Sequence, residues 1–201
     1  FAFTSEQDML RDTVARLVRE QYDFDTRRKV AKSEAGWRPE MWSQFAELGL
    51  LGASFSEADG GFGGSPIEAM IISEEFGKGL VIEPYLQTVV IGGGFLRYGG
   101  TAAQKEENLA DLIGGERRYA FAYSEPKSRY DLNDVSTTAR KDGKGFVLNG
   151  HKAVVTGAPF ATHIFVTART SGAQRDAAGV TVFLVPKNAK GVSTRDYPTV
   201  D

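Results

Sequence analysis

Two short segments in the second half of the chain each end in a hydroxyl residue beside a turn residue. The first runs from Phe121 to Ser124 and precedes a Glu-Pro pair, and the second ends at Thr156 and precedes Gly157. Extended backbone with free amides and a terminal hydroxyl can bind the polar edge of a flat heterocycle, because such an edge carries donors and acceptors in one plane. The two segments therefore indicate a site for a planar cofactor.

A simpler interpretation competes with this one. Two ordinary strands with hydroxyls at their ends would show the same spacing, and the spacing alone does not separate the two possibilities. Few other residues suggest chemistry. The two histidines, His151 and His163, have no carboxylate companions at metal-ligand spacing, so we interpret them as surface or hairpin residues and predict no metal site.

A glycine-rich run, residues 60–64, resembles a phosphate-binding loop. It lacks the lysine and the serine or threonine of a P-loop, and no strand precedes it. We interpret it as a tight connection, with the lining of a ligand cleft as the alternative, because glycine lets backbone approach closely. Glu83 precedes Pro84 at an expected helix start, where a carboxylate stabilises the helix dipole without any ligand.

The composition is that of an ordinary globular protein, with 41% apolar and 25% charged residues among 201. A formal charge of −2 gives no basic field to hold nucleic acid or an anionic membrane. The absence of cysteine excludes disulfides, thiolate zinc sites and a thiol nucleophile, and it suits the cytoplasmic location that we expect. The longest apolar stretch is broken by three glycines, so no membrane span of roughly 20 residues is predicted.

The first half of the chain carries helical signals. Ser65 and Thr101 each begin a capping-box pattern, and Gly49 and Gly77 are expected to end two of the helices. Apolar residues at helical spacing between positions 9 and 18 and between 42 and 48 mark two helices. Further helices are predicted over 65–76, 84–98 and 101–113.

After Gly115 the pattern changes to β. Strands are predicted over 119–124, 136–140, 146–148, 152–155, 164–168 and 180–185, and Asp142-Gly143 is a hairpin signal. We therefore predict an α+β fold, with a helical N-terminal domain over 1–115 and an antiparallel β domain, barrel-like or a sandwich, over 116–201. No helix closes the β domain, and the pattern leaves open a flexible tail on a complete protein or truncation of a longer one.

The two hydroxyl-ending segments resemble paired motifs of the acyl-CoA dehydrogenase family. That family carries Tyr-x-x-Thr-Glu-Pro-Gly-x-Gly-Ser-Asp and, further along, Asn-Gly-x-Lys-x-Trp-Ile-Thr-Asn. Residues 121–131 and 149–157 resemble these motifs at matching spacing, and residues 48–52 and 59–64 resemble a Leu-Gly-Leu turn and a Tyr-Gly-Gly loop. Within the family, residues 83–85 and 129–132 are most like the small subunit of pimeloyl-CoA-type dehydrogenases.

The resemblance implies a helical N-terminal domain, a β middle domain and a C-terminal helical bundle, the last of which is absent from this chain. It also implies FAD as the cofactor, with the flavin against the β domain. By position, Ser124 would bond the pyrimidine edge of the flavin, and Thr156 would bond its N5 and O4 atoms. Backbone contacts and the floor under the ring would come from Phe121, Ala122, Tyr123, Val154 and Val155.

The reaction implied by the resemblance is α,β-dehydrogenation of an acyl-CoA thioester, in which a glutamate removes the α-proton while the β-hydride passes to the flavin. In the family that glutamate comes from the C-terminal bundle. The expected base therefore lies beyond Asp201, no catalytic residue is assigned, and residues 1–201 alone are expected to be inactive. The implied partners are an acyl-CoA substrate, an acceptor such as an electron-transfer flavoprotein, and further subunits of a homo- or hetero-oligomer.

The chain departs from the family motifs at several positions. Tyr130 stands where the family serine meets the FAD pyrophosphate or the substrate, Val154 replaces a tryptophan, and Gly157 replaces an asparagine. These changes keep two alternatives open. One is a non-catalytic partner subunit of a heteromeric acyl-CoA dehydrogenase, and the other is a flavin oxidase or monooxygenase on the same fold.

Overall fold

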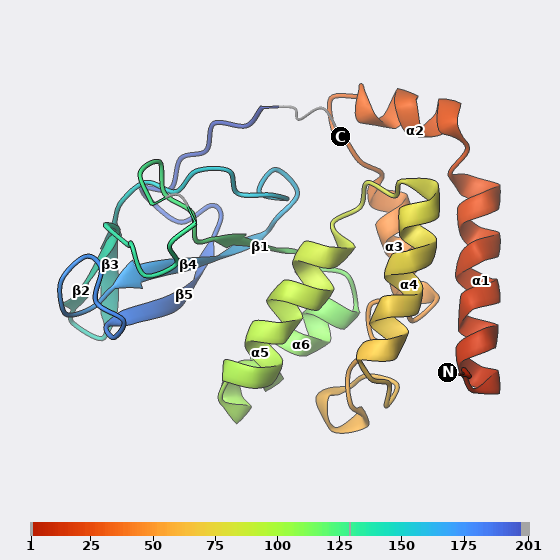
Figure 1. Ribbon diagram of the computed structural model, residues 1–201, viewed down its shortest axis with the longest axis horizontal. Helices are drawn as coiled ribbons and strands as arrows, with labels where there is room; N and C mark the ends of the chain where they lie inside the picture. Colours follow the sequence, from red (N-terminus) through yellow and green to blue (C-terminus); the bar gives the residue numbers. More distant parts are fainter. Residues whose placement is uncertain (1, 129, 198–201) are drawn as a thin grey trace. The chain divides into compact units, whose positions relative to one another are not determined.

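The computed structural model describes residues 2–128 and 130–197. The chain divides into two compact units, Phe1–Arg117 and Arg118–Asp201. The first unit is helical and the second contains the strands (Figure 1), so the predicted order of a helical region followed by a β region is confirmed. In the described ranges no helix combines the length and the apolar character that crossing a bilayer requires.

Side-chain caps begin several helices of the first unit. Ser65 and Thr101 each form the predicted reciprocal capping box, with Glu68 and Gln104 as the returning side chains. Such caps stabilise a helix start by about 1 kcal/mol each. The elements of this unit are α1 (Ser5–Gln21), α2 (Phe24–Ala31), α3 (Pro39–Glu47), the short helix η1 (Glu57–Asp59), α4 (Pro66–Gly79), η2 (Leu86–Gly92), α5 (Gly93–Gly99) and α6 (Ala102–Ile113).

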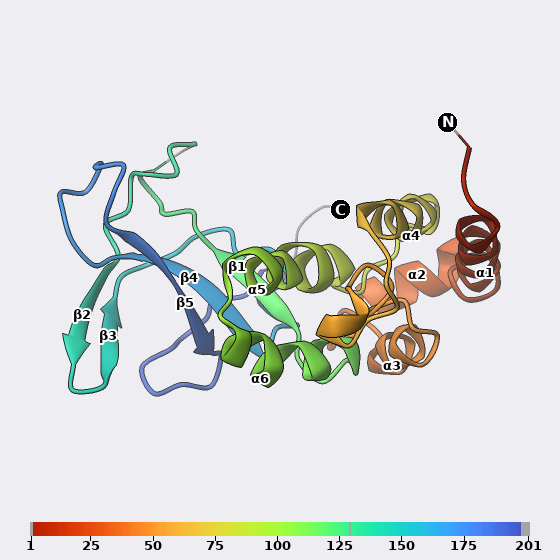
Figure 2. The same cartoon turned by 90° about the horizontal axis from the view of Figure 1, so that it is seen from below.

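One part of the core of the helical unit lies between α1 and α4. Helix α1 packs along α4 (Figure 2) and buries Val14, Leu17 and Val18. A row of aromatic rings continues the core, with Phe45 and Phe76 stacked at 4.6 Å between centroids and Tyr85 edge-on to Phe76 at 5.2 Å. Aromatic pairs in these arrangements add to the hydrophobic stabilisation of the core.

The helix predicted over 84–98 differs from the observed structure. It begins as a π-helical segment, η2, and becomes the α-helix α5 only at Gly93. Gly93 is buried against Phe55, and a Cβ at this position would lie 3.0 Å from Cε1 of that ring. Gly93 therefore serves close packing, whereas a Cβ on Gly94 would meet no neighbouring atom. The low helix propensity of the consecutive glycines is consistent with the departure from regular α geometry.

The β unit is built around β4 (His163–Arg169). Strand β5 (Val180–Pro186) pairs antiparallel along the whole of β4, β1 (Tyr119–Ala122) pairs with its first half in parallel, and β2 (Thr138–Asp142) joins it in parallel at its end. Strand β3 (Gly145–Asn149) forms the predicted hairpin with β2. The sheet is therefore mixed and not purely antiparallel as predicted, because the long connection from β1 to β4 returns the chain in the same direction.

The strand predicted over 152–155 is wrong. These residues form no regular strand, and a turn follows from Thr156 to Phe160. Val154 adopts a φ of 54°, in the left-handed region. That conformation is rare for a β-branched residue and interrupts an extended run, which explains why the β-rich composition of this segment misleads.

Candidate functional site

The candidate site lies where β1 ends and β2 begins along one edge of β4. Strand β1 reaches as far as the pair Ala122–Val166, and β2 begins with the pair Thr138–Arg169. In the described part of the sheet, Thr167 and Ala168 therefore have no strand partner on this edge. The side chains beside this interval determine how residues 121–124 and 153–156 are held together.

A buried carboxylate joins the segment after β1 to the segment before β2. Glu125 is 5% exposed and accepts five hydrogen bonds, from the backbone amides and hydroxyls of Ser136 and Thr137 and from the Lys152 ammonium. The amide bonds measure 2.8 and 2.9 Å and the ammonium bond 2.8 Å. Burial alone would raise the pKa of Glu125, but the hydrogen bonds from Lys152, Ser136 and Thr137 outweigh it and lower the pKa to about 2.

Lys152 connects three parts of the unit. Its ammonium donates to Oε1 of Glu125, to the Tyr123 carbonyl at 3.3 Å and to Oγ1 of Thr167 at 2.9 Å. Its side chain is only 9% exposed. Burial lowers the pKa of Lys152, and the hydrogen bond to Glu125 opposes that shift.

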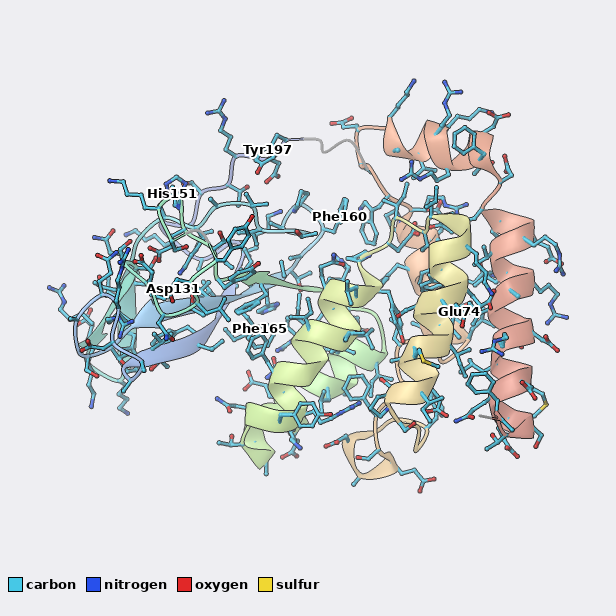
Figure 3. The ribbon with its side chains drawn as sticks, in the orientation of Figure 1. Glu74, Asp131, His151, Phe160, Phe165 and Tyr197 are labelled. Carbon is cyan, nitrogen blue, oxygen red and sulfur yellow. The ribbon has the colours of Figure 1, made fainter. Side chains whose placement is uncertain are left out.

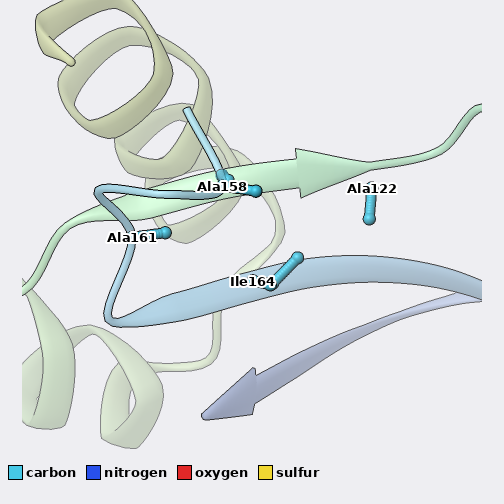
Figure 4. Close-up of a cluster of buried hydrophobic side chains, with 5 residues drawn as sticks. Ala122, Ala158, Ala161 and Ile164 are labelled. Carbon is cyan, nitrogen blue, oxygen red and sulfur yellow. The ribbon is translucent and has the colours of Figure 1, made fainter. Parts of the chain in front are cut away.

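The backbone brings the two predicted segments together directly. The Ala153 amide donates to the Ser124 carbonyl at 2.9 Å. Next to this bond, an alanine-rich cluster packs the turn after Thr156 onto one face of β1 (Figure 4), and its small side chains permit a close approach. The cluster consists of Ala120, Ala122, Ala158, Ala161 and Ile164.

The predicted flavin-facing residues lie in different surroundings. Ser124 is half-buried and Thr156 is exposed, and neither hydroxyl forms a hydrogen bond to the part of the chain that the structure describes. The rings of Phe121 and Tyr123 stack on one another at 5.1 Å between centroids. Ala122 belongs to the alanine-rich cluster on the opposite face of the strand.

The remaining predicted residues are more exposed. Val155 is half-buried against the alanine-rich cluster, whereas Val154 is 67% exposed. Tyr130 is fully exposed, and within the described ranges no hydrogen bond or ring contact joins it to the other candidate residues. The structure thus brings residues 121–124 and 153–156 together and leaves Tyr130 apart from them.

Sequence reasoning did not select Glu125 or Lys152, although both lie within the quoted motifs. The two motifs already point to this pair. One contains an acid, in Glu-Pro, and the other contains a lysine, in Asn-Gly-x-Lys, and the two segments are expected to meet. The sequence pattern does not reveal that both side chains are buried. A buried carboxylate requires donors of this kind, and only the fold shows that they converge.

The glycine of the second motif has a packing role. A Cβ on Gly150 would lie 2.6 Å from Cβ of Thr137, which is a donor to Glu125. We expect Gly150→Ala to lower the free energy of unfolding by about 1–3 kcal/mol through overpacking, measured by urea denaturation. Gly145→Ala is the matched control, because a Cβ there makes an ordinary 3.9 Å contact. Equal losses in the two variants would contradict this account.

Other motifs that the sequence suggested have structural explanations. Gly61 and Gly64 press against the backbone of Phe55 and Ala53, and Gly63 and Gly64 also line an open hollow of about 410 Å³ in the helical unit. His151 is exposed (Figure 3). Among the described residues, no group of three or more acidic or histidine side chains converges to hold a metal ion.

Comparison with known protein families gives a match for each of the two units. Residues 4–116 match the acyl-CoA dehydrogenase N-terminal domain, and residues 120–200 match the acyl-CoA dehydrogenase middle domain. The chain belongs to the acyl-CoA dehydrogenase family. The two matches follow the division of the chain into a helical and a β unit, and they confirm the resemblance drawn from the motifs.

Family relatives cover nearly the whole chain. The 3-(aryl)acrylate reductase of Clostridium sporogenes is 34% identical over 95% of this chain and 50% of its own length. Mitochondrial isovaleryl-CoA dehydrogenase of Pongo abelii is 34% identical over 95% of this chain and 46% of its own. Among solved structures, the ChsE4-ChsE5 complex from Mycobacterium tuberculosis matches with a TM-score of 0.81 and 28% identity, over 95% of this chain and 50% of that one. The chain thus spans about half the length of the curated relatives it matches.

Proposed function

We propose that the protein carrying this chain is an FAD-dependent acyl-CoA dehydrogenase, and that its β unit supplies the flavin-facing wall of the active site. The observation that carries the proposal is the pairing of residues 121–124 with residues 153–156. Their separation is fixed by the Ala153–Ser124 backbone bond and by the Lys152 ammonium. Family membership makes FAD the cofactor to which this pairing is best compared.

The residues at this edge fit an isoalloxazine ring. The hydroxyls of Ser124 and Thr156 are free to donate within the described structure, and the two segments that carry them are held side by side. We assign Ser124 to the pyrimidine edge and Thr156 to the N5 and O4 edge, where donors stabilise the negative charge that develops on reduction. Backbone and ring-floor contacts are assigned to Phe121, Ala122, Tyr123, Val154 and Val155.

When bound, FAD would supply the hydride acceptor for oxidation of the Cα–Cβ bond of an acyl-CoA thioester. The described residues contribute binding and orientation, and we assign none of them as the base. Tyr130 offers an exposed hydroxyl that we assign to the FAD pyrophosphate or the substrate. Its large ring in place of the family serine would narrow the space there and influence which acyl groups enter.

The proposed dehydrogenase activity also implies a substrate, an electron acceptor and partner subunits. We propose an acyl-CoA substrate, an electron-transfer flavoprotein as acceptor, and assembly with like or unlike subunits. The similar two-protein ChsE4-ChsE5 complex supports a heteromeric assembly, and it also keeps the non-catalytic partner subunit as a second candidate. The finer assignment to a pimeloyl-CoA-type small subunit rests on residues 83–85 and 129–132 alone, and the cytoplasmic location stays a prediction.

The test uses the whole purified protein, reconstituted with FAD. We expect a stable yellow complex whose flavin absorbance bleaches when a suitable acyl-CoA is added without oxygen, because the hydride passes to the flavin. Absence of a bound flavin band after reconstitution would count against the proposal. A flavin that binds but is bleached only with a companion chain present would favour the partner-subunit candidate, and stoichiometric peroxide with oxygen as sole acceptor would favour an oxidase.

A further inference from the structure

Lys152 makes more contacts than neutralising one carboxylate would require. Its ammonium donates to Glu125, Tyr123 and Thr167, which belong to the segment after β1 and to β4. We propose that Lys152 is a positioning residue, which holds residues 121–124 and 153–156 at the separation that a single flavin ring requires. This inference rests on the proposed function and assigns a role that the motif match alone does not give.

The geometry distinguishes positioning from simple charge pairing. The side chain of Lys152 reaches the Tyr123 carbonyl, and the amide of the next residue, Ala153, reaches the Ser124 carbonyl. Two consecutive residues of one segment are thus bonded to two consecutive residues of the other. Such a double link fixes both the distance and the relative rotation of the segments, which a lone ion pair does not do.

The chemistry of the side chain matches its surroundings. An ammonium has three N–H donors and no acceptor, and the structure gives Lys152 three acceptors. The other bonds to the Glu125 carboxylate come from Ser136 and Thr137, so the lysine completes a saturated site. A planar guanidinium with its forked donors does not fit this arrangement, so arginine is not an equivalent residue here.

Loss of this link should weaken cofactor binding in addition to any loss of stability from breaking the buried charge pair. Residues 153–156 form no regular strand, so the described contacts that hold them to β1 are the Lys152 bonds, the Ala153 bond and the packing of Val155. Without the ammonium this segment gains freedom relative to Ser124. A ligand that must meet donors on both segments then binds less well, because part of its binding free energy is used to order the segment.

The experiment compares FAD affinity in the whole protein for the parent and Lys152→Met. Apoprotein is titrated with FAD at a temperature where circular dichroism shows both proteins folded. We expect the Kd for FAD to rise about tenfold or more in Lys152→Met and to rise in Lys152→Arg as well. Lys141→Met, which removes an exposed charge from β2, is the matched control and should bind like the parent.

A second pair of variants guards against loss of folding. Thr167→Val removes one acceptor of Lys152 but keeps the Glu125 pair, and Thr167→Ser keeps the hydroxyl. We expect weaker FAD binding and a shifted flavin absorption band in the valine variant, and parent-like behaviour in the serine variant. FAD affinity equal to the parent in folded Lys152→Met and Thr167→Val would overturn the positioning role. A parent that binds no FAD would instead overturn the proposed function.

Discussion

Replacing Glu125 by glutamine is expected to lower the free energy of unfolding by about 3–5 kcal/mol, because it breaks a buried charge pair from one side. The Lys152 ammonium would remain buried without its carboxylate. The amide NH₂ of glutamine would also face N–H donors from Ser136 or Thr137, which need an acceptor at that point. Urea denaturation at pH 7, followed by circular dichroism, measures the loss.

Ionisation of the same carboxylate should make the free energy of unfolding depend on pH in the acid range. The folded-state pKa of Glu125, about 2, lies below its ordinary value of 4.5, so the folded protein favours the ionised form. This contribution is fully present above about pH 4.5 and is lost as the pH falls toward about 2. Glu125→Gln carries no such charge, so its stability should fall less steeply across this window than that of the parent.

Asp142→Asn is the matched control for both measurements. Asp142 is an exposed acid at the hairpin of the same unit, and asparagine suits that turn equally well. We expect its stability to stay within about 0.5 kcal/mol of the parent. If Glu125→Gln changed the stability no more than Asp142→Asn, the five hydrogen bonds to this carboxylate would not stabilise the fold.

The features that the sequence predicts correctly have local causes. The capping boxes at Ser65 and Thr101 and the Asp142-Gly143 hairpin each depend on residues within one turn of chain, so their signals survive whatever surrounds them. The nearness of the Ser124 and Thr156 segments came from a motif resemblance, which carries non-local information that periodicity does not.

The features that escape prediction depend on distant partners. Val154 belongs to a β-rich run yet adopts left-handed backbone beside the Lys152 link. The parallel pairing of β1 with β4 depends on how a long connection folds back. The burial of Glu125 and Glu83 depends on residues far away in the sequence, and charge patterning alone places acids at the surface.

Glu83 leads to the last prediction, because the structure gives it a different role from the helix-dipole partner that the sequence suggested. Its side chain is fully buried, Oε1 accepts the Arg38 amide at 3.1 Å, and Oε2 has no hydrogen-bond partner in the described structure. The Arg38 guanidinium is near, with Nε 4.0 Å from Oε1. Burial raises the pKa of Glu83 from 4.5 to about 7, and the backbone amides of Glu83, Arg38 and Ile82 only partly offset it.

A raised folded-state pKa means that the folded protein favours the neutral acid. The stability of the parent should therefore decline as the pH rises from about 4.5 to about 7, by about 3 kcal/mol in total, and should not decline further above that range on this account. Glu83→Gln stays neutral throughout. We expect it to lack this decline, to match the parent near pH 5 and to exceed the parent's stability near pH 8, as measured by urea denaturation at both values.

Glu34→Gln, at an exposed acid of the same unit, controls for the removal of one negative charge and should follow the parent at both pH values. If Glu83→Gln were instead less stable than the parent at pH 8, the ionised carboxylate would be stabilising, and its attraction to Arg38 would exceed the cost of burial. The sign of that single difference therefore decides whether the acid is held neutral or works as half of a buried ion pair.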